Sequence, residues 1–182
     1  DVRRSVHTAL TVALLSGVFL MAVGAALSRT LLELTSSPED VIDLATLYLR
    51  IYFCGMPANM FYNFGSAILR AQGDTRRPLY FLTAAGIVNV GLNLIFVIGL
   101  QMSVAGVALA TIAAQYISAV LVFICLMRDQ GPLHFDLHCL QLDRRTIKRV
   151  LQVGLPAGFQ GLVFSLSNVV IQSSIDTFAS TV

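Results

Sequence analysis

Long apolar stretches separated by short charged segments dominate the chain. Residues 78–127 form a run of fifty without a single Asp, Glu, Lys, Arg or His. One helical crossing of a bilayer takes about 20 residues, so this run has the length for two crossings. Residues 101–103 (Gln-Met-Ser) are the natural place for a tight link between them. The pattern predicts a protein whose helices span a membrane several times.

The same pattern predicts five membrane spans. The second is expected to bend at Gly55 and Pro57, because proline removes one backbone donor and crowds the preceding turn. Gly154 and Pro156 are expected to bend the fifth in the same way. No initiator Met is present and the last residues stop inside an apolar stretch, so the chain reads as an excerpt of a longer protein. The predicted spans are about 9–27, 51–69, 79–100 and 104–127, with the fifth beginning near 150.

Lysine and arginine residues gather in alternate segments between the spans. Ten of the twelve fall in segments that this alternation places on one side of the membrane. Short cytoplasmic loops carry such an excess, so we assign that side to the cytoplasm and the protein to the cytoplasmic membrane. The ten residues are Arg3, Arg4, Arg70, Arg76, Arg77, Arg128, Arg144, Arg145, Lys148 and Arg149.

The longest link, residues 128–149, differs in kind from the others. In its second half apolar residues alternate with basic ones, which predicts a short amphipathic helix on the membrane surface with its basic side chains toward the phospholipid heads. It is also the best candidate for a boundary between two helical bundles. We therefore expect three parts: residues 1–127 with four spans, the cytoplasmic linker 128–149, and residues 150–182 as the truncated first helix of a second bundle.

The composition favours one class of protein and disfavours others. The chain is 56% hydrophobic and 12% charged, with a net charge of +2, which implies lipid as its solvent. The basic residues lie in short clusters between spans, so nucleic acid is not an expected partner. His134, His138 and Cys139 lack the spacing of a metal site, and no phosphate loop or nucleophile motif is present. We expect an all-α polytopic membrane protein that is not an enzyme and has no metal or organic cofactor.

Polar side chains inside the apolar spans are the candidates for function. Asn89 and Asn93 lie four residues apart on the third span, so both amides share one helix face. Thr111 and Gln115 have the same spacing on the fourth span. Such groups are costly in hydrocarbon and usually face a partner helix or a water-filled cavity. Two interpretations stay open: hydrogen bonds that only hold helices together, or a binding site.

The fifth span carries a longer polar stripe. Asn168, Gln172 and Asp176 follow one another at intervals of four residues and so share a face. Asp176 is the only acid inside an apolar run, which makes it a candidate for ion coupling. It lies twenty residues after Pro156, about 30 Å of helix, so a place in water at the outer membrane surface is also open.

Three segments together resemble one family, the multidrug and toxic compound extrusion (MATE) transporters. Residues 68–78, Ile-Leu-Arg-Ala-Gln-Gly-Asp-Thr-Arg-Arg-Pro, look like the cytoplasmic link after that family's fourth helix. Residues 89–93, Asn-Val-Gly-Leu-Asn, and 104–111, Val-Ala-Gly-Val-Ala-Leu-Ala-Thr, are similar to its fifth helix and the start of its sixth. Residues 153–160, Val-Gly-Leu-Pro-Ala-Gly-Phe-Gln, resemble the start of its seventh. The order and orientation of the segments match as well.

This resemblance implies a two-lobe protein of twelve helices, of which the chain would contain the third to most of the seventh. It implies a secondary antiporter that exports small organic cations or drugs by alternating access, driven by Na⁺ or H⁺. Its partners would be the lipid bilayer and the remaining helices of the same transporter.

The resemblance also implies ligand positions for the coupling ion. In the family's proton-coupled branch, the amino-terminal lobe uses an acid on helix one and polar residues on helices five and six, which correspond here to Asn89, Asn93 and Thr111. Relatives often carry an acid where this chain has Asn93, and an amide can coordinate a cation but cannot take up a proton. Where this chain has Asp176, relatives usually carry an amide.

Two other functions are open alternatives. A flippase for lipid-linked saccharides, from the same superfamily, would line its cavity with Arg or Lys to hold phosphates, and here basic residues in the spans lie only near their ends. A non-transporting membrane scaffold would use the polar positions for helix contacts alone. In that case, changing Asn93 or Asp176 would lower the stability of the protein and would not affect transport.

Overall fold

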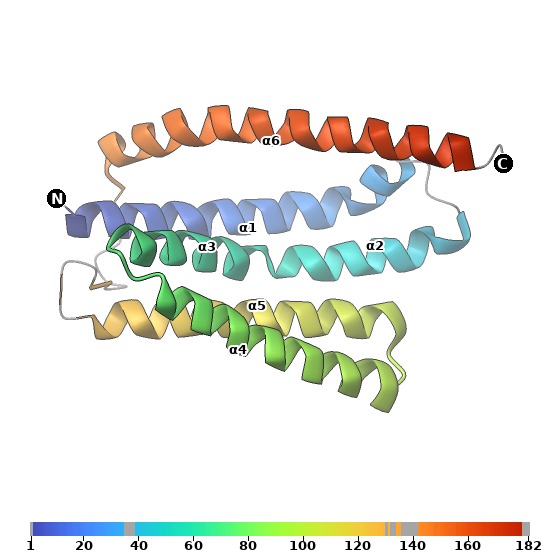
Figure 1. Cartoon of the computed structure of the whole chain (residues 1–182), viewed down its shortest axis with the longest axis horizontal. Coiled ribbons are helices and arrows are strands. Elements are labelled where there is room, and N and C mark those ends of the chain that lie inside the picture. Colours follow the sequence, from blue (N-terminus) through green and yellow to red (C-terminus); the bar gives the residue numbers. More distant parts are fainter. Residues whose placement is uncertain (1, 35–38, 130, 132–133, 136–141, 180–182) are drawn as a thin grey trace. The chain divides into compact units, whose positions relative to one another are not determined.

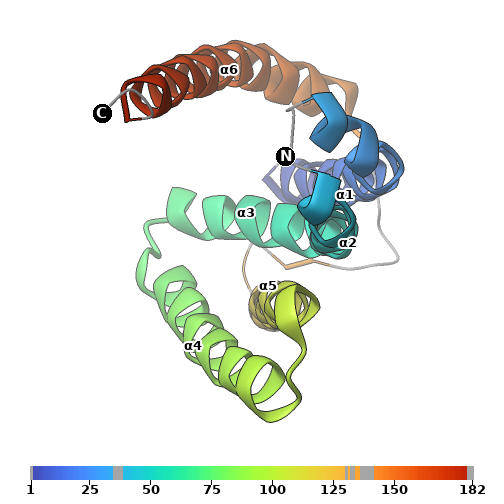
Figure 2. The ribbon, with the colours of Figure 1, turned by 90° about the vertical axis from the view of Figure 1, so that its right-hand side faces the viewer.

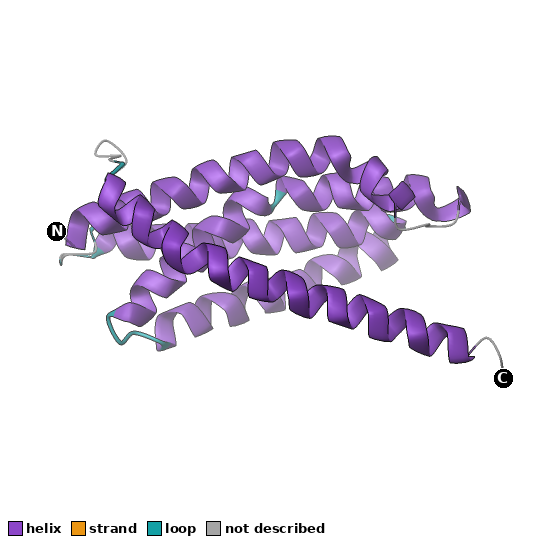
Figure 3. Cartoon of the chain, turned by 90° about the horizontal axis from the view of Figure 1, so that it is seen from above, coloured by secondary structure: helices purple, strands orange, loops and turns teal. Residues whose placement is uncertain are grey.

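The computed structural model describes residues 2–34, 39–129, 131, 134–135 and 142–179, and at 34, 39–41, 169–170 and 172–179 it describes the backbone only. Helices are the only regular secondary structure in this part of the chain (Figure 3), so the predicted all-α fold is confirmed. The elements are α1 (Val2–Leu34), α2 (Glu39–Cys54), α3 (Met56–Ala71), α4 (Arg76–Asn93), the π-helix η1 (Leu94–Gly99), α5 (Ser103–Arg128) and α6 (Arg144–Ala179).

Four of these segments are long and apolar enough to cross a membrane: α1, α4 continued by η1, α5, and residues 144–168 of α6. The predicted link at residues 101–103 is present, because η1 ends at Gly99 and α5 begins at Ser103. The second predicted span consists of two helices, α2 and α3, each of 16 residues and separated at Gly55. The multi-pass helical architecture is therefore confirmed, and the second span is broken where a bend was expected.

The chain divides into two compact units, residues 1–142 and 143–182. The division falls inside the stretch predicted as a linker. In the first unit, α2 and α3 form a middle layer with α1 packed along one side and α5 along the other, and α4 packs on α5 (Figures 1 and 2). This layered bundle holds Asn89, Asn93 and Thr111, half of the candidate binding residues.

Buried apolar side chains of the first unit form a cluster that involves α1, α3 and α5. Through Val6, Leu69 and Leu126 it brings together the beginning of α1 and the ends of α3 and α5. The three basic segments of the first unit therefore lie at one end of the bundle, as the alternation of basic loops predicts (Figure 1). The buried members are Val6, Leu10, Ala58, Phe61, Leu69, Ala119, Val122, Leu126 and Phe135.

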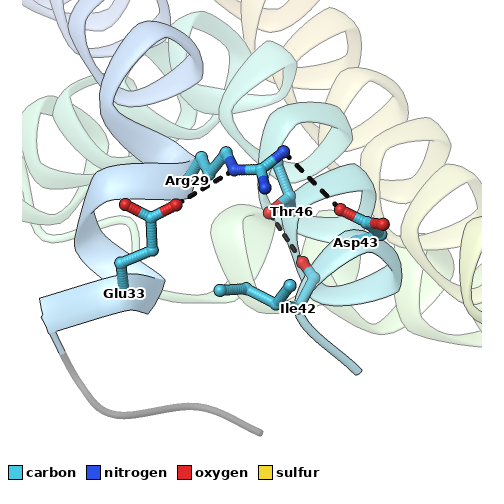
Figure 4. A network of polar contacts seen from close by, with 5 residues as sticks. All are labelled: Arg29, Glu33, Ile42, Asp43 and Thr46. Carbon is cyan, nitrogen blue, oxygen red and sulfur yellow. Dashed lines mark hydrogen bonds and ion pairs between the residues drawn. The ribbon is translucent and has the colours of Figure 1, made fainter. Parts of the chain in front are cut away.

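At the opposite end, Arg29 of α1 lies between two acids (Figure 4). Its Nε is 3.0 Å from Glu33 Oε1, and its Nη1 is 3.7 Å from Asp43 Oδ1 of α2. All three side chains are more than half exposed, so each pair contributes about 0–1 kcal/mol. The assignment of this end to the outside of the membrane stays a prediction from the basic loops.

The break between α2 and α3 lies against the backbone of α1. A Cβ atom added at Gly17 would come 2.5 Å from Pro57 Cα and 3.1 Å from the Met56 carbonyl oxygen. Backbone atoms cannot shift out of the way as a side-chain tip can, so only glycine fits at this position of α1. The close approach allows the interrupted span to pack along α1 over its whole length.

The turn between α3 and α4 is a Schellman motif. Gly73 N donates to Arg70 O at 2.9 Å and Asp74 N donates to Leu69 O at 3.1 Å, so carbonyls at the end of α3 are satisfied. Gly73 has φ +87°, a left-handed conformation that glycine adopts without steric cost. Asp74 then starts α4, since its Oδ1 accepts from Arg77 N at 3.1 Å and its Oδ2 lies 3.1 Å from Arg77 Nε.

In the second unit, α6 runs without interruption from Arg144 to Ala179 and contains Pro156. The surface helix expected within residues 128–149 is not a separate element in the described residues, because residues 144–149 are the first turns of α6. Asp143 begins the helix: its Oδ2 accepts from Thr146 Oγ1 at 2.9 Å and from Thr146 N at 3.0 Å. These donors, the hydroxyl above all, hold the pKa of the Asp143 carboxyl below its ordinary value.

We expect Gly73→Ala to destabilise the purified membrane protein by about 1–2 kcal/mol, because a Cβ atom is strained in the left-handed region. Gly86→Ala, in the interior of α4 with no atom within 4 Å of the added Cβ beyond its chain neighbours and the adjacent helix backbone, is the matched control and should not be destabilising. Denaturant titration in detergent micelles measures both. Equal stability of the two variants would contradict the turn described above.

We expect Gly17→Leu to destabilise the protein by at least about 1–3 kcal/mol, the usual cost of an overpacked contact. Ala22→Leu adds the same side chain at an exposed position of α1 and should leave stability nearly unchanged. Thermal unfolding followed by circular dichroism compares the two. If both variants unfold together with the wild type, α1 does not approach the α2–α3 break as closely as described.

We expect the Asp143 cap to depend on pH. Since the folded-state pKa is lowered, the stabilisation is present above the ordinary aspartate pKa of about 4 and is lost as the pH falls through the lower folded value. Hydrogen exchange of the first turn of α6, corrected for intrinsic rates, should accelerate in wild type below about pH 4. In Asp143→Asn, a neutral cap, the protection should not vary with pH over this range.

Candidate functional site

The two asparagines predicted on the third span contact each other at the end of α4. Asn93 Nδ2 donates to Asn89 Oδ1 at 3.0 Å, and both side chains are half-buried. Asn93 Oδ1 is buried and has no hydrogen-bond partner among the described residues. An unsatisfied buried acceptor costs about 1–3 kcal/mol. A ligand that donated a hydrogen bond to this oxygen, or was coordinated by it, would remove that cost.

A change in helix type follows Asn93 immediately. Residues 94–99 form the π-helix η1, and Leu100 N donates to Ile95 O at 3.0 Å, the five-residue step of that helix. Single π-turns inside α-helices occur frequently at functional sites. Here the wider turn begins at the residue after the asparagine with the unpaired oxygen. The apolar sequence of η1 gives no sign of it.

Thr111 lies on α5 at the depth of the asparagine pair. Two contacts define how α4–η1 and α5 run against each other: Arg77 Nη1 lies 3.7 Å from Cys125 Sγ, and Phe96 packs on Gly106. Nineteen residues separate these contacts along each helix, so Thr111 is about level with Gly91, midway between Asn89 and Asn93. Thr111 Oγ1 donates to Val107 O at 2.9 Å. The lone pairs of this oxygen can still accept a hydrogen bond or coordinate a cation.

Gln115, one turn further along α5, faces the break in the second span. Its Oε1 is buried without a hydrogen-bond partner among the described residues, and an added Cβ atom at Gly55 would collide with it. Tyr116 Oη donates to the carbonyl of Cys54 at 3.0 Å, on the same break. Gln115 and Tyr116 of α5 therefore both contact the α2–α3 break, where a proline interrupts the backbone hydrogen bonds.

A second asparagine pair, on α3, was missed by the sequence analysis. Asn63 Nδ2 lies 2.6 Å from Asn59 Oδ1 and also donates to Asn59 O at 2.9 Å. The spacing of four residues is the same as for Asn89 and Asn93, so the pattern was available.

The remaining predicted site residues lie on α6, in the second unit. Asn168 is exposed, as are Gly154 and Pro156. The side chains of Gln172 and Asp176 lie outside the described residues, and so do His138 and Cys139. The structure thus brings together Asn89 and Asn93 and places Thr111 at their depth, and the polar stripe of α6 stays a prediction. A role of Gly55, Pro57, Gly154 and Pro156 as moving hinges also stays a prediction.

An apolar groove of about 220 Å³ opens beside the break. Residues of α1, α3 and α5 line it, and Tyr116 is the only one of these lining residues with a polar side-chain group. Such a surface suits aromatic or aliphatic groups. The lining residues are Leu14, Pro57, Ala58, Phe61, Tyr116, Ala119, Val120 and Phe123.

The polar groups of the predicted site on α4 and α5 are the amides of Asn89 and Asn93 and the hydroxyl of Thr111. Amide and hydroxyl oxygens coordinate hard cations and accept hydrogen bonds from ligands, but they do not change charge near neutral pH. Within the described side chains, the membrane-spanning part of α4–η1 and α5 contains no carboxylate or histidine. This polar region can therefore hold a cation or a hydrogen-bond donor and cannot itself carry a proton across.

The architecture defines a multi-pass membrane protein with broken helices and polar groups within its apolar spans. The sequence profile of the MatE family matches residues 1–95. The chain belongs to this family, as its motifs indicated.

Known relatives agree with this assignment. The chain is 29% identical to "Probable multidrug resistance protein YoeA" of Bacillus subtilis, over 96% of this chain and 39% of the relative. It is 33% identical to "Probable multidrug resistance protein YpnP" of the same organism, over 88% of this chain and 36% of the relative. The chain spans about two fifths of the length of these relatives.

The fold agrees with a solved structure of the same family. An outward-facing multidrug resistance MATE family transporter of the MOP superfamily superposes with a TM-score of 0.81. The two sequences are 25% identical, and the match covers 90% of this chain and 37% of the other. The chain thus shares its fold with a membrane transporter, a class whose members in general are not enzymes.

Proposed function

We propose that the chain is part of a secondary antiporter that exports organic cations or drugs across the cytoplasmic membrane, driven by inward flow of Na⁺ or H⁺. The observation that carries this proposal is the Asn89–Asn93 pair with its buried, unpaired Asn93 Oδ1. Membership of the MatE family and the multidrug resistance names of the relatives support it.

The proposed ion or substrate ligands in the first unit are Asn89, Asn93 and Thr111. A ligand that bound Asn93 Oδ1 would give a partner to a buried acceptor that has none among the described residues, and this gain would add to the binding free energy. Asn168, Gln172 and Asp176 are the corresponding candidates on α6. Because the oxygens of the first unit are neutral, proton coupling would require an acid elsewhere in the transporter, whereas Na⁺ coupling could use these oxygens directly.

The apolar groove supports an amphipathic substrate. Organic cations with aromatic or aliphatic parts bury those parts against such a surface, and Tyr116 and Phe123 offer ring faces for a cationic group. The break at Gly55 and Pro57 lies between the groove and Gln115. Discontinuous helices near the centre of the membrane are typical of the binding regions of secondary transporters.

The test uses the full-length transporter in liposomes with a fluorescent organic cation. A Na⁺ gradient and a pH gradient are imposed separately, and dye flux is recorded for wild type, Asn93→Ala, Thr111→Ala and Asp176→Asn. We expect one gradient to drive flux and Asn93→Ala to lower it about tenfold or more, the usual cost of one hydrogen bond to a charged group.

Thr83→Ala is the matched control for Thr111→Ala. Thr83 Oγ1 donates to Leu79 O at 2.9 Å, the same local bond that Thr111 makes, but on an exposed face of α4. A structural role of the hydroxyl would lower both fluxes equally. Normal flux in Asn93→Ala would remove the pair from the mechanism. Absence of flux under either gradient in wild type would reject cationic drugs as substrates and favour a flippase or a scaffold.

A further inference from the structure

Phe135, in the linker that follows α5, packs its aromatic side chain into the helical bundle. Phe135 is 0% exposed, as buried as Leu10 or Leu126, although it lies in a loop. His134, beside it, is half-buried, and Gly131 is exposed. A loop residue buried to this degree is held by packing and not by local secondary structure.

Side chains of three helices surround Phe135, and we call this surface, made by His7, Phe61 and Phe123, its seat. Its ring centroid lies 5.1 Å from that of His7 of α1, 6.2 Å from that of Phe61 of α3 and 6.1 Å from that of Phe123 of α5. The two phenylalanine contacts are edge-to-face, the arrangement that aromatic rings prefer. His7 is itself buried and held in place, because its Nδ1–H donates to Arg3 O at 2.7 Å.

The backbone of the linker is attached at the same place. Phe135 N donates to Leu126 O at 3.2 Å, and so satisfies one of the last carbonyls of α5, which have no partner within the helix. His134 Nδ1–H donates to Asp129 O at 3.1 Å and His134 N to Gly131 O at 3.2 Å. The described residues Gly131, His134 and Phe135 are thus tied by hydrogen bonds to one another and to the end of α5.

The walls of this seat also belong to the apolar groove. Phe61 and Phe123 contact each other, with centroids 6.0 Å apart, and both line the groove beside Pro57. Pro57 and Phe61 are one helical turn apart on α3, next to the break. A ligand in the groove, or a change of bend at Gly55, would move the same two rings that hold Phe135.

We propose that Phe135 is a detachable anchor that fixes the linker to the cytoplasmic end of the amino-terminal bundle and is released when Phe61 moves relative to Phe123. Phe135 would act as a positioning residue for transport. The anchoring part rests on the contacts above alone. The release rests on the proposed function, since it requires that a transported ligand or the transport cycle moves α3 against α5.

Limited proteolysis of the full-length transporter in inside-out vesicles tests the anchor. Trypsin needs an extended chain around the cleaved bond, so cleavage after Arg128 reports how often the end of α5 and the contacts of Phe135 open. We expect Phe135→Ala to raise this rate about tenfold or more, because a fully buried ring is lost. Phe135→Leu, which keeps an apolar side chain, should give a smaller increase.

Leu142→Ala is the matched control, because Leu142 is an apolar residue of the same linker that is 55% exposed. Its cleavage rate should equal that of wild type. Phe123→Leu alters the seat from the other side and should also raise the rate. Equal cleavage of wild type, Phe135→Ala and Phe123→Leu would overturn the anchor, whatever the transport measurements show.

The release is tested in the same vesicles with a lipophilic organic cation added. We expect the cation to change the cleavage rate of wild type and to have no effect on Phe135→Ala, in which the anchor is already open. A cation that is transported but leaves wild-type cleavage unchanged would overturn the release and leave the anchor standing. If no cation is transported, the proposed function fails, and the cleavage rates of the variants still decide on the anchor.

Discussion

Gly17 and Pro57 bring two helix backbones closer together than any side chain would permit, and the arrangement of the first unit depends on this contact. In a bilayer every backbone polar group needs a partner inside the protein, so a helix can be interrupted only where neighbouring groups cover the gap. At the break between α2 and α3, α1 supplies a bare backbone on one side. On the other side α5 supplies Tyr116, which binds the Cys54 carbonyl. The interrupted span therefore lies in the middle layer, where both neighbours reach it.

Much of this bundle could be predicted because lipid imposes simple rules. The charge-free run located α4, α5 and the turn between them, and the alternation of basic segments predicted which helix ends lie together. The bend at Gly55 and Pro57 followed from proline chemistry. The asparagine pair on α4 followed from a spacing of four residues. The second pair, Asn59 and Asn63 on α3, has the same spacing and was missed.

Other features had no signal in the pattern. The π-helix η1 is a run of apolar residues that reads as ordinary helix, and burial of Phe135 depends on three helices that are distant in the sequence. The sequence predicts a surface helix for what are the first turns of α6, because alternating basic and apolar residues are typical both of a helix on a membrane and of one entering it. The side chains of Gln172 and Asp176 lie outside the described residues, so the stripe on α6 rests on its spacing.

The two halves of the broken span have a consequence for how the protein is made. Each has 16 residues, about 24 Å of helix, whereas the hydrocarbon core is about 30 Å thick. Neither half can cross the membrane alone, and α2 also carries Glu39, Asp40, Asp43 and Arg50. The insertion machinery must therefore accept α2 and α3 as one unit. Since α1 is synthesised before them, the backbone around Gly17 that covers the break is already made when α2 and α3 are inserted.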